Sequence, residues 1–377
     1  MSAPGSTVVD CAGAGDFSTL AEALAVASDG DIIDVAPCTY TEQVDFGGRS
    51  VTLRATSPSL AQGGPADTII DAEGAGPVVV ARSGEGDGTA VIGFTLTGGV
   101  ETAFGGAVFV DLSSIRLEDV TVTGNRGTAI LYSHSGAVEL RDVTFTANSV
   151  TEGGAAITLY RGTLDATGVD LGCDGGAYGM YFGHGTALID ASNIACAAGT
   201  PVYWDHATGR LERSRLDGPV VVINEAEHEF DVVTMENDIF TSGQGIYVEY
   251  GTAILRNSVV NGPLTLVGVG APVVEANVFL GGRCAIDADP TTEPFSPAYN
   301  SFWGATSESC DGTVWSGADG NFTSDPLFTD QAGGDYTLLP GSPCVDAGLP
   351  APAHTDPDGT RNDIGAYGGH KSIGGGW

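Results

Sequence analysis

A repeat of about 22 residues is the feature of this sequence that most restricts its fold. Segments 162–173 (GTLDATGVDLGC) and 185–196 (GTALIDASNIAC) share one frame, and their final cysteines are 23 positions apart (196 − 173). A period of roughly 20 to 50 residues indicates a repeat architecture in which each unit buries its apolar face against its neighbours. Ser or Asn recurs with a similar period after an apolar segment, at Asn125, Asn148, Ser192, Ser214, Asn237, Asn257, Asn277 and Asn300.

Units this short are rich in Val, Ile, Leu and Thr and leave no room for a crossover helix. Each unit therefore indicates one coil of a parallel β-solenoid, so the predicted fold class is all-β. Stacked Asn side chains can hydrogen-bond along the axis as ladders, and Asn tolerates the left-handed backbone of a sharp bend. The alternative is an antiparallel sandwich, but its turn signals recur about every 8 to 12 residues.

The cysteines fit a stapled solenoid. Adjacent coils lie about 4.8 Å apart, within the range of Cα separations that a disulfide requires. The sequence holds seven cysteines, and matched positions predict bridges between Cys11 and Cys38, Cys173 and Cys196, and Cys284 and Cys310, with Cys344 left as a buried thiol. Free thiols or a metal site are the alternative, although no C-x-x-C spacing occurs. Disulfides imply oxidising surroundings and therefore export.

The chain is strongly acidic. Its 48 acidic and 14 basic residues give a net charge of −34, and Lys371 is its single lysine. Such a surface repels polyanions, which argues against nucleic acid, anionic lipid and polyuronates as partners unless cations bridge them. Solubility in a salty environment is an alternative reason for the charge. No apolar run is long enough for a membrane span, and the opening MSAPGST lacks the apolar core of a signal peptide, so an export signal was removed or the protein stays inside.

The two ends of the chain differ from the repeats. Residues 18–28 are predicted to form a helix, because Thr19 and Glu22 make a capping box and Leu20, Ala23, Leu24 and Ala27 form an apolar stripe. We expect this helix to cover the open N-terminal end of the solenoid.

Residues 15–46, followed by GGRSVTLRA, resemble the opening of right-handed parallel β-helix proteins of the pectin-lyase-like superfamily. Parallel crossovers are also right-handed in general. The segment after Pro326 (DPLFTDQAGGDYTLLPGSPCVDAG) resembles the closing segment of secreted bacterial β-helix proteins. We therefore expect a β-helix over residues 1–325 and a C-terminal cap over 326–377. Within the cap, Asp356, Asp358, Asn362 and Asp363 could bind Ca²⁺ or serve as turn residues.

The strand that follows a glycine in each coil carries the candidate site. Side chains alternate along it between core and surface. The expected core residues are Val108, Ile130, Ile157, Met180, Val202, Val221 and Ile246, with Val110, Tyr132, Leu159, Phe182, Trp204, Ile223 and Val248. The expected outward columns are Phe109, Leu131, Thr158, Tyr181, Tyr203, Val222 and Tyr247, and beside them Asp111, Ser133, Tyr160, Gly183, Asp205, Asn224 and Glu249.

A row of outward aromatic rings flanked by acids and histidines suits a sugar chain, because rings stack on pyranose faces while polar groups bind hydroxyls. The resemblance implies that this strand belongs to the sheet that bears the superfamily's active sites. The predicted substrate-binding residues are Tyr181, Tyr203, Tyr247, Tyr160, Arg161, Asn224, Phe109 and Asp111. The alternative is that outward tyrosines simply favour β-sheet.

The catalytic signatures of the superfamily's hydrolases, lyases and esterases have no match in this sequence. Asp205 and Glu249 are expected two coils apart, about 9.6 Å, near the upper end of carboxylate separations in inverting glycosidases, with Asn224 between them. His184 and His206 could act as acid and base, or could bind a metal together with Asp205. The predicted catalytic set is Asp205, Glu249, His206 and His184, with no metal ligand and no required cofactor, Ca²⁺ being an option.

These observations predict a secreted or cell-surface monomer that binds an extracellular polysaccharide. As an enzyme, it would cleave that polysaccharide as a hydrolase or as a lyase. The alternative from another class is a non-catalytic adhesin or structural spacer. Catalysis requires a localised acid/base constellation, whereas an adhesin requires only the extended face.

Overall fold

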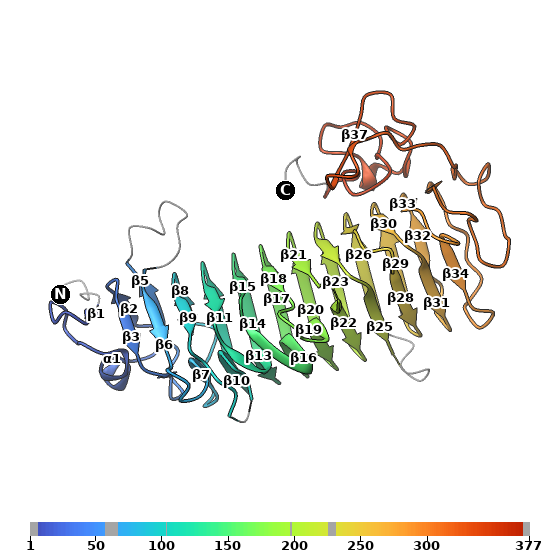
Figure 1. Ribbon diagram of the computed structural model, residues 1–377. Coiled ribbons are helices and arrows are strands. Elements are labelled where there is room, and N and C mark those ends of the chain that lie inside the picture. Colours follow the sequence, from blue (N-terminus) through green and yellow to red (C-terminus); the bar gives the residue numbers. More distant parts are fainter. Residues whose placement is uncertain (1–6, 57–66, 103, 197, 225–230, 372–377) are drawn as a thin grey trace. The chain divides into compact units, whose positions relative to one another are not determined.

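The computed structural model describes residues 7–56, 67–102, 104–196, 198–224 and 231–371 (Figure 1). Two compact units make up the chain, residues 1–187 and residues 188–377, called here the first and second unit. Strand β20 (Thr186–Asp190) contains the boundary between them. Each unit is described by itself.

The first unit is built of coils, and a coil contributes one strand to each of three sheets, A, B and C. The described strand pairs of this unit are parallel. Sheet A contains β1 (Thr7–Val9), β2 (Ile32–Val35), β5 (Thr52–Ala55), β8 (Ala90–Ile92), β11 (Ser114–Glu118), β14 (Ala137–Arg141) and β17 (Thr163–Thr167). Sheet B contains β3 (Thr39–Thr41), β6 (Ile69–Asp71), β9 (Thr95–Thr97), β12 (Thr121–Thr123), β15 (Thr144–Thr146) and β18 (Asp170–Gly172). Sheet C contains β4 (Val44–Asp45), β7 (Val79–Ala81), β10 (Val108–Asp111), β13 (Arg126–His134), β16 (Ser149–Tyr160) and β19 (Tyr178–Gly183).

The second unit repeats this architecture. Its sheet A strands are β23 (Thr208–Glu212), β26 (Val232–Glu236), β29 (Thr252–Arg256) and β32 (Val273–Glu275). Its sheet B strands are β21 (Asn193–Ala195), β24 (Arg215–Asp217), β27 (Ile239–Phe240), β30 (Val259–Asn261), β33 (Val278–Leu280) and β35 (Ser301–Trp303). Its sheet C strands are β22 (Thr200–Asp205), β25 (Val220–Ile223), β28 (Ile246–Glu249), β31 (Leu264–Val267) and β34 (Ile286–Ala288). The predicted fold class, an all-β right-handed parallel β-helix, is confirmed.

The N-terminal helix α1 (Leu20–Val26) is shorter than predicted but has the expected cap and buried face. The Thr19 hydroxyl accepts a hydrogen bond from the Glu22 amide, and Leu20 and Leu24 are buried. The Glu42 carboxylate also accepts from the first amides of the helix, so it satisfies donors that a helix terminus leaves unpaired. Helix α1 contacts β1 and β4 of the first coils. Among the described residues, no helix is long and apolar enough to cross a membrane.

Polar ladders run along turns between sheets, between B and C in the first unit and between A and B in the second. In the first unit, the backbone amides of Gly99, Asn125 and Asn148 donate to the side chain one coil further on, at 2.8, 3.1 and 2.8 Å. The second unit has a ladder of its own at the A–B turn, through Ser192, Ser214, Asp238, Ser258, Asn277, Asn300 and Asn321. The predicted equivalence of Asn125 and Asn148 with these positions was wrong, because Asn125 and Asn148 follow strands of sheet B. The expected ladder positions of Asn237 and Asn257 were wrong by one residue, because Asp238 and Ser258 occupy those places.

Asn237 and Asn257 instead bind the C-terminal segment, which folds back along the second unit's sheet B (Figure 1). The Asn237 amide donates to the carbonyls of Ala366 and Gly368 at 3.1 and 2.5 Å, and Asn362 donates to Asn257 at 3.1 Å. The segment contains the antiparallel hairpin β36 (Phe328–Asp330) and β37 (Asp335–Leu338) and the short 3₁₀ helix η2 (Pro352–His354). Its apolar contacts with the strands join Tyr336, Cys344, Ile364 and Ala366 to Ile239, Val259, Val278 and Leu280.

The disulfide predictions agree with the structure where bridges are described. Cys11 bonds Cys38 and Cys284 bonds Cys310. Cys173 and Cys196 are also disulfide-bonded. Cys344 is a free buried thiol, and burial raises its pKa to about 12, so the unreactive thiol form persists at neutral pH.

Candidate functional site

Sheet C has one face in the core and one face outward, as alternation predicted. Met180 and Phe182 of β19 and Val202 and Trp204 of β22 are fully buried, whereas the residues between them, Tyr181 and Tyr203, are half-buried on the outward face. The same holds for Ile157 and Leu159 in β16 and for Ile246 and Val248 in β28.

Strand β13 is a correction to the predicted facing. Val108 pairs with Leu131 and Phe109 with Tyr132, so Leu131 and Ser133 point inward and Tyr132 points outward. The prediction counted residues from the glycine that opens each coil. That count fails because the pairing of β13 with β16 shifts between Gly127 and Ala129.

Strand β25 is a second correction. Val202 pairs with Val220 and Asp205 with Ile223, so Val221 and Ile223 face outward while Val222 is buried. Asn224 does not lie on the outward column between Asp205 and Glu249. It is buried at the following turn, where its backbone amide donates to the Glu249 carbonyl at 2.9 Å.

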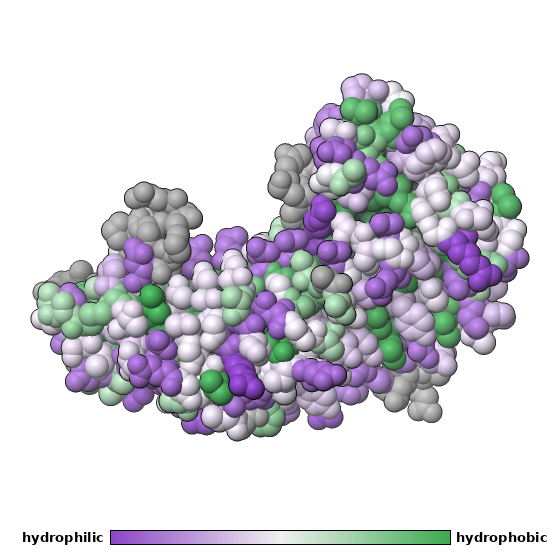
Figure 2. Space-filling model, in the orientation of Figure 1, coloured by the Kyte–Doolittle hydropathy of each residue, from purple (hydrophilic) through white to green (hydrophobic). Residues whose placement is uncertain are grey.

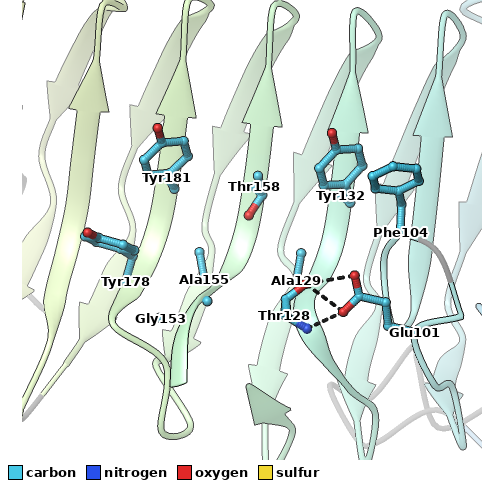
Figure 3. A pocket seen from close by; sticks show the side chains of 11 residues that line it. Glu101, Phe104, Thr128, Ala129, Tyr132, Gly153, Ala155, Thr158, Tyr178 and Tyr181 are labelled. Atoms are coloured by element: carbon cyan, nitrogen blue, oxygen red, sulfur yellow. Dashed lines mark hydrogen bonds between the residues drawn. The ribbon is translucent and has the colours of Figure 1, made fainter. Parts of the chain in front are cut away.

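A groove of about 320 Å³ lies on the outward face of the first unit's sheet C, over β13, β16 and β19 (Figure 3). Tyr132 and Tyr181 stand on either side of Thr158, one coil from each. The two rings therefore project from positions about 9.6 Å apart. The remaining lining residues are Glu101, Phe104, Thr128, Ala129, Gly153, Gly154, Ala155 and Tyr178.

The two walls of the groove are aromatic and its floor is made of small residues. Phe104 stacks on Tyr132 with ring centroids 4.9 Å apart and on Phe109 at 5.7 Å, while Tyr178 packs on Tyr181 at 5.7 Å. The intervening positions carry Gly, Ala or Thr, so no large side chain fills the space between the walls. A flat ring with polar edges fits such a slot, because its faces can stack while its edges reach polar groups.

Two polar groups of the groove, the Glu101 carboxylate and the Tyr132 hydroxyl, have a hydrogen-bonding role that the structure defines. The Glu101 carboxylate accepts hydrogen bonds from the backbone amide and the hydroxyl of Thr128, the latter at 2.7 Å (Figure 3). Burial, and after it the charge of Asp111, raises the pKa of the Tyr132 hydroxyl, so this group is a neutral donor and acceptor.

Beyond the groove, the strand ends carry a cluster around Tyr160. His134 Nδ1 lies 2.8 Å from Asp111 Oδ1, and the His134 ring stacks on Tyr160 at 6.0 Å. His184 meets the edge of Tyr160 at 5.6 Å, and the Arg161 guanidinium lies 5.3 Å from its centroid. The structure thus brings together the predicted residues Asp111, Tyr160, Arg161 and His184, next to the groove rather than in it.

The second unit holds the predicted carboxylates Asp205 and Glu249. His206 Nδ1 is 2.5 Å from Asp205 Oδ1, and the Tyr247 hydroxyl donates to Glu249 Oε2 at 3.1 Å. Their register places them two coils apart with the apolar Ile223 between them. Because Nδ1 contacts Asp205 and Nε2 is buried, the His206 ring does not present a nitrogen to a ligand on the outward face.

Of the five aromatic or acidic residues that line the groove, the sequence-based prediction included Tyr181 and missed Glu101, Phe104, Tyr132 and Tyr178. Tyr132 was assigned to the core. Tyr178 lies at the start of β19, three residues before Tyr181, and the predicted outward columns did not extend that far. Glu101 and Phe104 precede β10 in a connection whose place over the sheet no periodicity encodes. The GGVETAFGG composition, apolar and acidic residues between glycines, was the only available signal.

In the acidic C-terminal cluster, the side chains of Asp356, Asp358 and Asp363 accept hydrogen bonds from nearby backbone amides. Asp363 accepts from the Asp346 amide at 2.7 Å, Asp356 accepts from the Asp363 amide at 3.0 Å, and Asp358 accepts from Thr360. Burial raises the pKa of Asp356 to about 6 and raises that of Asp363. Within the described part of the chain, no three His, Cys, Asp or Glu side chains are placed to hold a metal ion together.

Comparisons with known proteins bear on the fold. No protein-family model and no curated protein matches the chain. Among solved structures it is similar to PfbA, a surface adhesin of Streptococcus pneumoniae, with a TM-score of 0.53 and 10% identity over 80% of this chain and 90% of that one. Pectate lyase Pel9A gives a TM-score of 0.47 at 13% identity, covering 96% and 95% of the two chains. The PL6 family alginate lyase AlyGC gives 0.48 at 13%, covering 81% and 48%. At these identities the likeness concerns the pectin-lyase-like β-helix fold alone.

Proposed function

We propose that this protein binds the chain of an extracellular polysaccharide on the outward face of sheet C, with the groove of the first unit as the principal site. The observation that carries the proposal is the pair of aromatic walls, Phe104 with Tyr132 and Tyr178 with Tyr181, separated by a coil with the small Thr158. Aromatic contacts of this kind contribute about 0.5 to 1.5 kcal/mol each beyond area burial. The disulfides support an oxidising, secreted or cell-surface location.

Filling the slot tests the binding proposal. Thr158→Tyr places a ring between the walls and should weaken binding of the best ligand from a polysaccharide panel at least tenfold by isothermal titration calorimetry. Thr265→Tyr is the matched control, because Thr265 is also an outward residue of sheet C, in β31 of the second unit. Equal affinity of both variants and the unmodified protein would place the site elsewhere.

Cleavage is a second candidate function, favoured by the carboxylates Asp205 and Glu249, which lie two coils apart on the outward face of the second unit's sheet C. Asp205→Asn or Glu249→Gln should abolish turnover and retain binding, since each change keeps shape but removes a proton-transfer group. Reducing ends report hydrolysis and unsaturated products report lyase action. Binding without either product, in the unmodified protein, would favour the adhesin function.

A further inference from the structure

The charge of the groove restricts the sugar that it can hold. Among the eleven described residues that line the groove, Glu101 is the only acid, and none is Lys, Arg or His. Arg161 lies over Tyr160 at the strand end and is not a lining residue. An anionic sugar in this groove would therefore meet a carboxylate and no cationic partner, on a chain of net charge −34.

A divalent cation would not offset the repulsion between an anionic sugar and Glu101 within the groove. Ca²⁺ takes six to eight oxygen ligands, including carboxylates, and Glu101 is the single carboxylate among the described lining residues. Its oxygens already accept the amide and hydroxyl protons of Thr128. This engagement also orients Glu101 as a fixed acceptor at one end of the groove, beside Thr128 (Figure 3).

The walls and floor favour an uncharged ring. The side-chain polar groups among the described lining residues are the Glu101 carboxylate and the hydroxyls of Thr128, Thr158, Tyr132, Tyr178 and Tyr181. Hydroxyls both donate and accept, which matches the hydroxyls of a neutral sugar. A cationic amino sugar would gain one carboxylate that is already hydrogen-bonded.

We infer that the groove selects an uncharged pyranose chain and that Glu101 is the residue that excludes uronates. This inference rests on the proposed function and assigns its ligand class. One ring lies between Tyr132 and Tyr181, with its hydroxyls toward Glu101. The acidic surface elsewhere on the chain adds a long-range repulsion that salt screens, whereas the effect of Glu101 is local.

The test compares hexasaccharides of different charge: cellohexaose, mannohexaose and xylohexaose, hexagalacturonate, and hexaglucosamine. Calorimetry is done with EDTA present, at 50 and 500 mM NaCl. At least one neutral probe should bind ten or more times more tightly than hexagalacturonate at both salt concentrations. Glu101→Gln should narrow this ratio by roughly three- to tenfold, the size expected for removing one nearby charge.

Glu139→Gln is the matched control. Glu139 faces outward from sheet A, is 44% exposed in its side chain, and does not line the groove. Its substitution should leave the ratio unchanged within twofold. Hexagalacturonate or hexaglucosamine binding as tightly as every neutral probe at 500 mM NaCl would overturn the inference and leave the proposed function standing. Absence of binding by all five probes would overturn both.

Discussion

Asp238 shows how one buried residue adapts to a place that its neighbours fill with amides. It is fully buried in the ladder position occupied elsewhere by Asn277 and Asn300, and it accepts the Ser214 amide at 2.9 Å. Burial raises the pKa of Asp238 well above its usual range, and the charges of Glu212 and Glu236 add to the effect. The ladder therefore favours a neutral side chain, which a protonated Asp supplies.

Asp238→Asn should stabilise the protein at neutral pH by about 1 kcal/mol, the usual size of a buried polar penalty. A folded-state pKa raised above the unfolded value gives stability that is full below about pH 4 and is lost as pH rises toward the folded pKa. The variant lacks this titration, so urea unfolding at pH 5 and pH 8 should show a gain that is larger at pH 8. A loss of stability at both values would contradict the role assigned to Asp238.

At this scale the sequence predicted which residue types form ladders but not every member. Asn237 and Asn257 stand beside Asp238 and Ser258, and either neighbour could serve by composition. The choice depends on the C-terminal segment, which binds Asn237 and Asn257 from more than 100 residues away along the chain. Local periodicity carries no information on that contact.

Among the elements, seven of the eleven strands of sheet C were predicted, and the facing of β10, β16, β19, β22 and β28 was correct. Strand β25 has the sequence VVVI, so alternation of polarity cannot distinguish its two faces. The prediction therefore relied on the spacing from neighbouring coils, and that spacing placed Val221 and Ile223 in the core. Strand β13 failed for the other reason, its shifted register. The groove depends on Tyr132, so it was not visible from the sequence although its other wall, Tyr181, was.

Adjacent valines in β25 test the corrected facing. Val222→Asp introduces a charge into the core and should cost at least 3 kcal/mol or prevent folding, whereas Val221→Asp places the same charge outward and should change stability by less than about 1 kcal/mol. Thermal melts of the two variants provide the comparison. The reverse order would restore the original facing and discard the corrected column.

At the scale of the whole molecule, the second unit departs from simple alternation where its C-terminal segment lies. The outward positions of sheet B are Thr95, Thr121 and Thr144 in the first unit but Ile239, Val259 and Val278 in the second. Both faces of β30 and β33 are consequently buried. Segments such as SVVNG and NVFL contain this signal, since consecutive apolar residues indicate a strand covered on both faces. On the face visible in Figure 2, the coils of the first unit carry mainly hydrophilic residues and residues of intermediate hydropathy.

The net charge of −34 predicts how the whole protein responds to salt. Self-repulsion destabilises a folded chain of this charge, whereas surface ion pairs such as Arg54–Asp34 stabilise it weakly. Salt screens both the repulsion and the ion pairs, and at this net charge we expect the loss of repulsion to dominate. Raising NaCl from 10 to 300 mM should therefore increase the melting temperature by several degrees in scanning calorimetry. A decrease would mean that ion pairs outweigh the repulsion.

The most direct measurement is a crystal structure of the protein with a bound neutral hexasaccharide. We expect one pyranose ring between Tyr132 and Tyr181, above Thr158, with hydroxyls within hydrogen-bond distance of Glu101. Sugar bound over Asp205 and Glu249 instead, with none between Tyr132 and Tyr181, would contradict the assignment of the first unit's groove as the binding site.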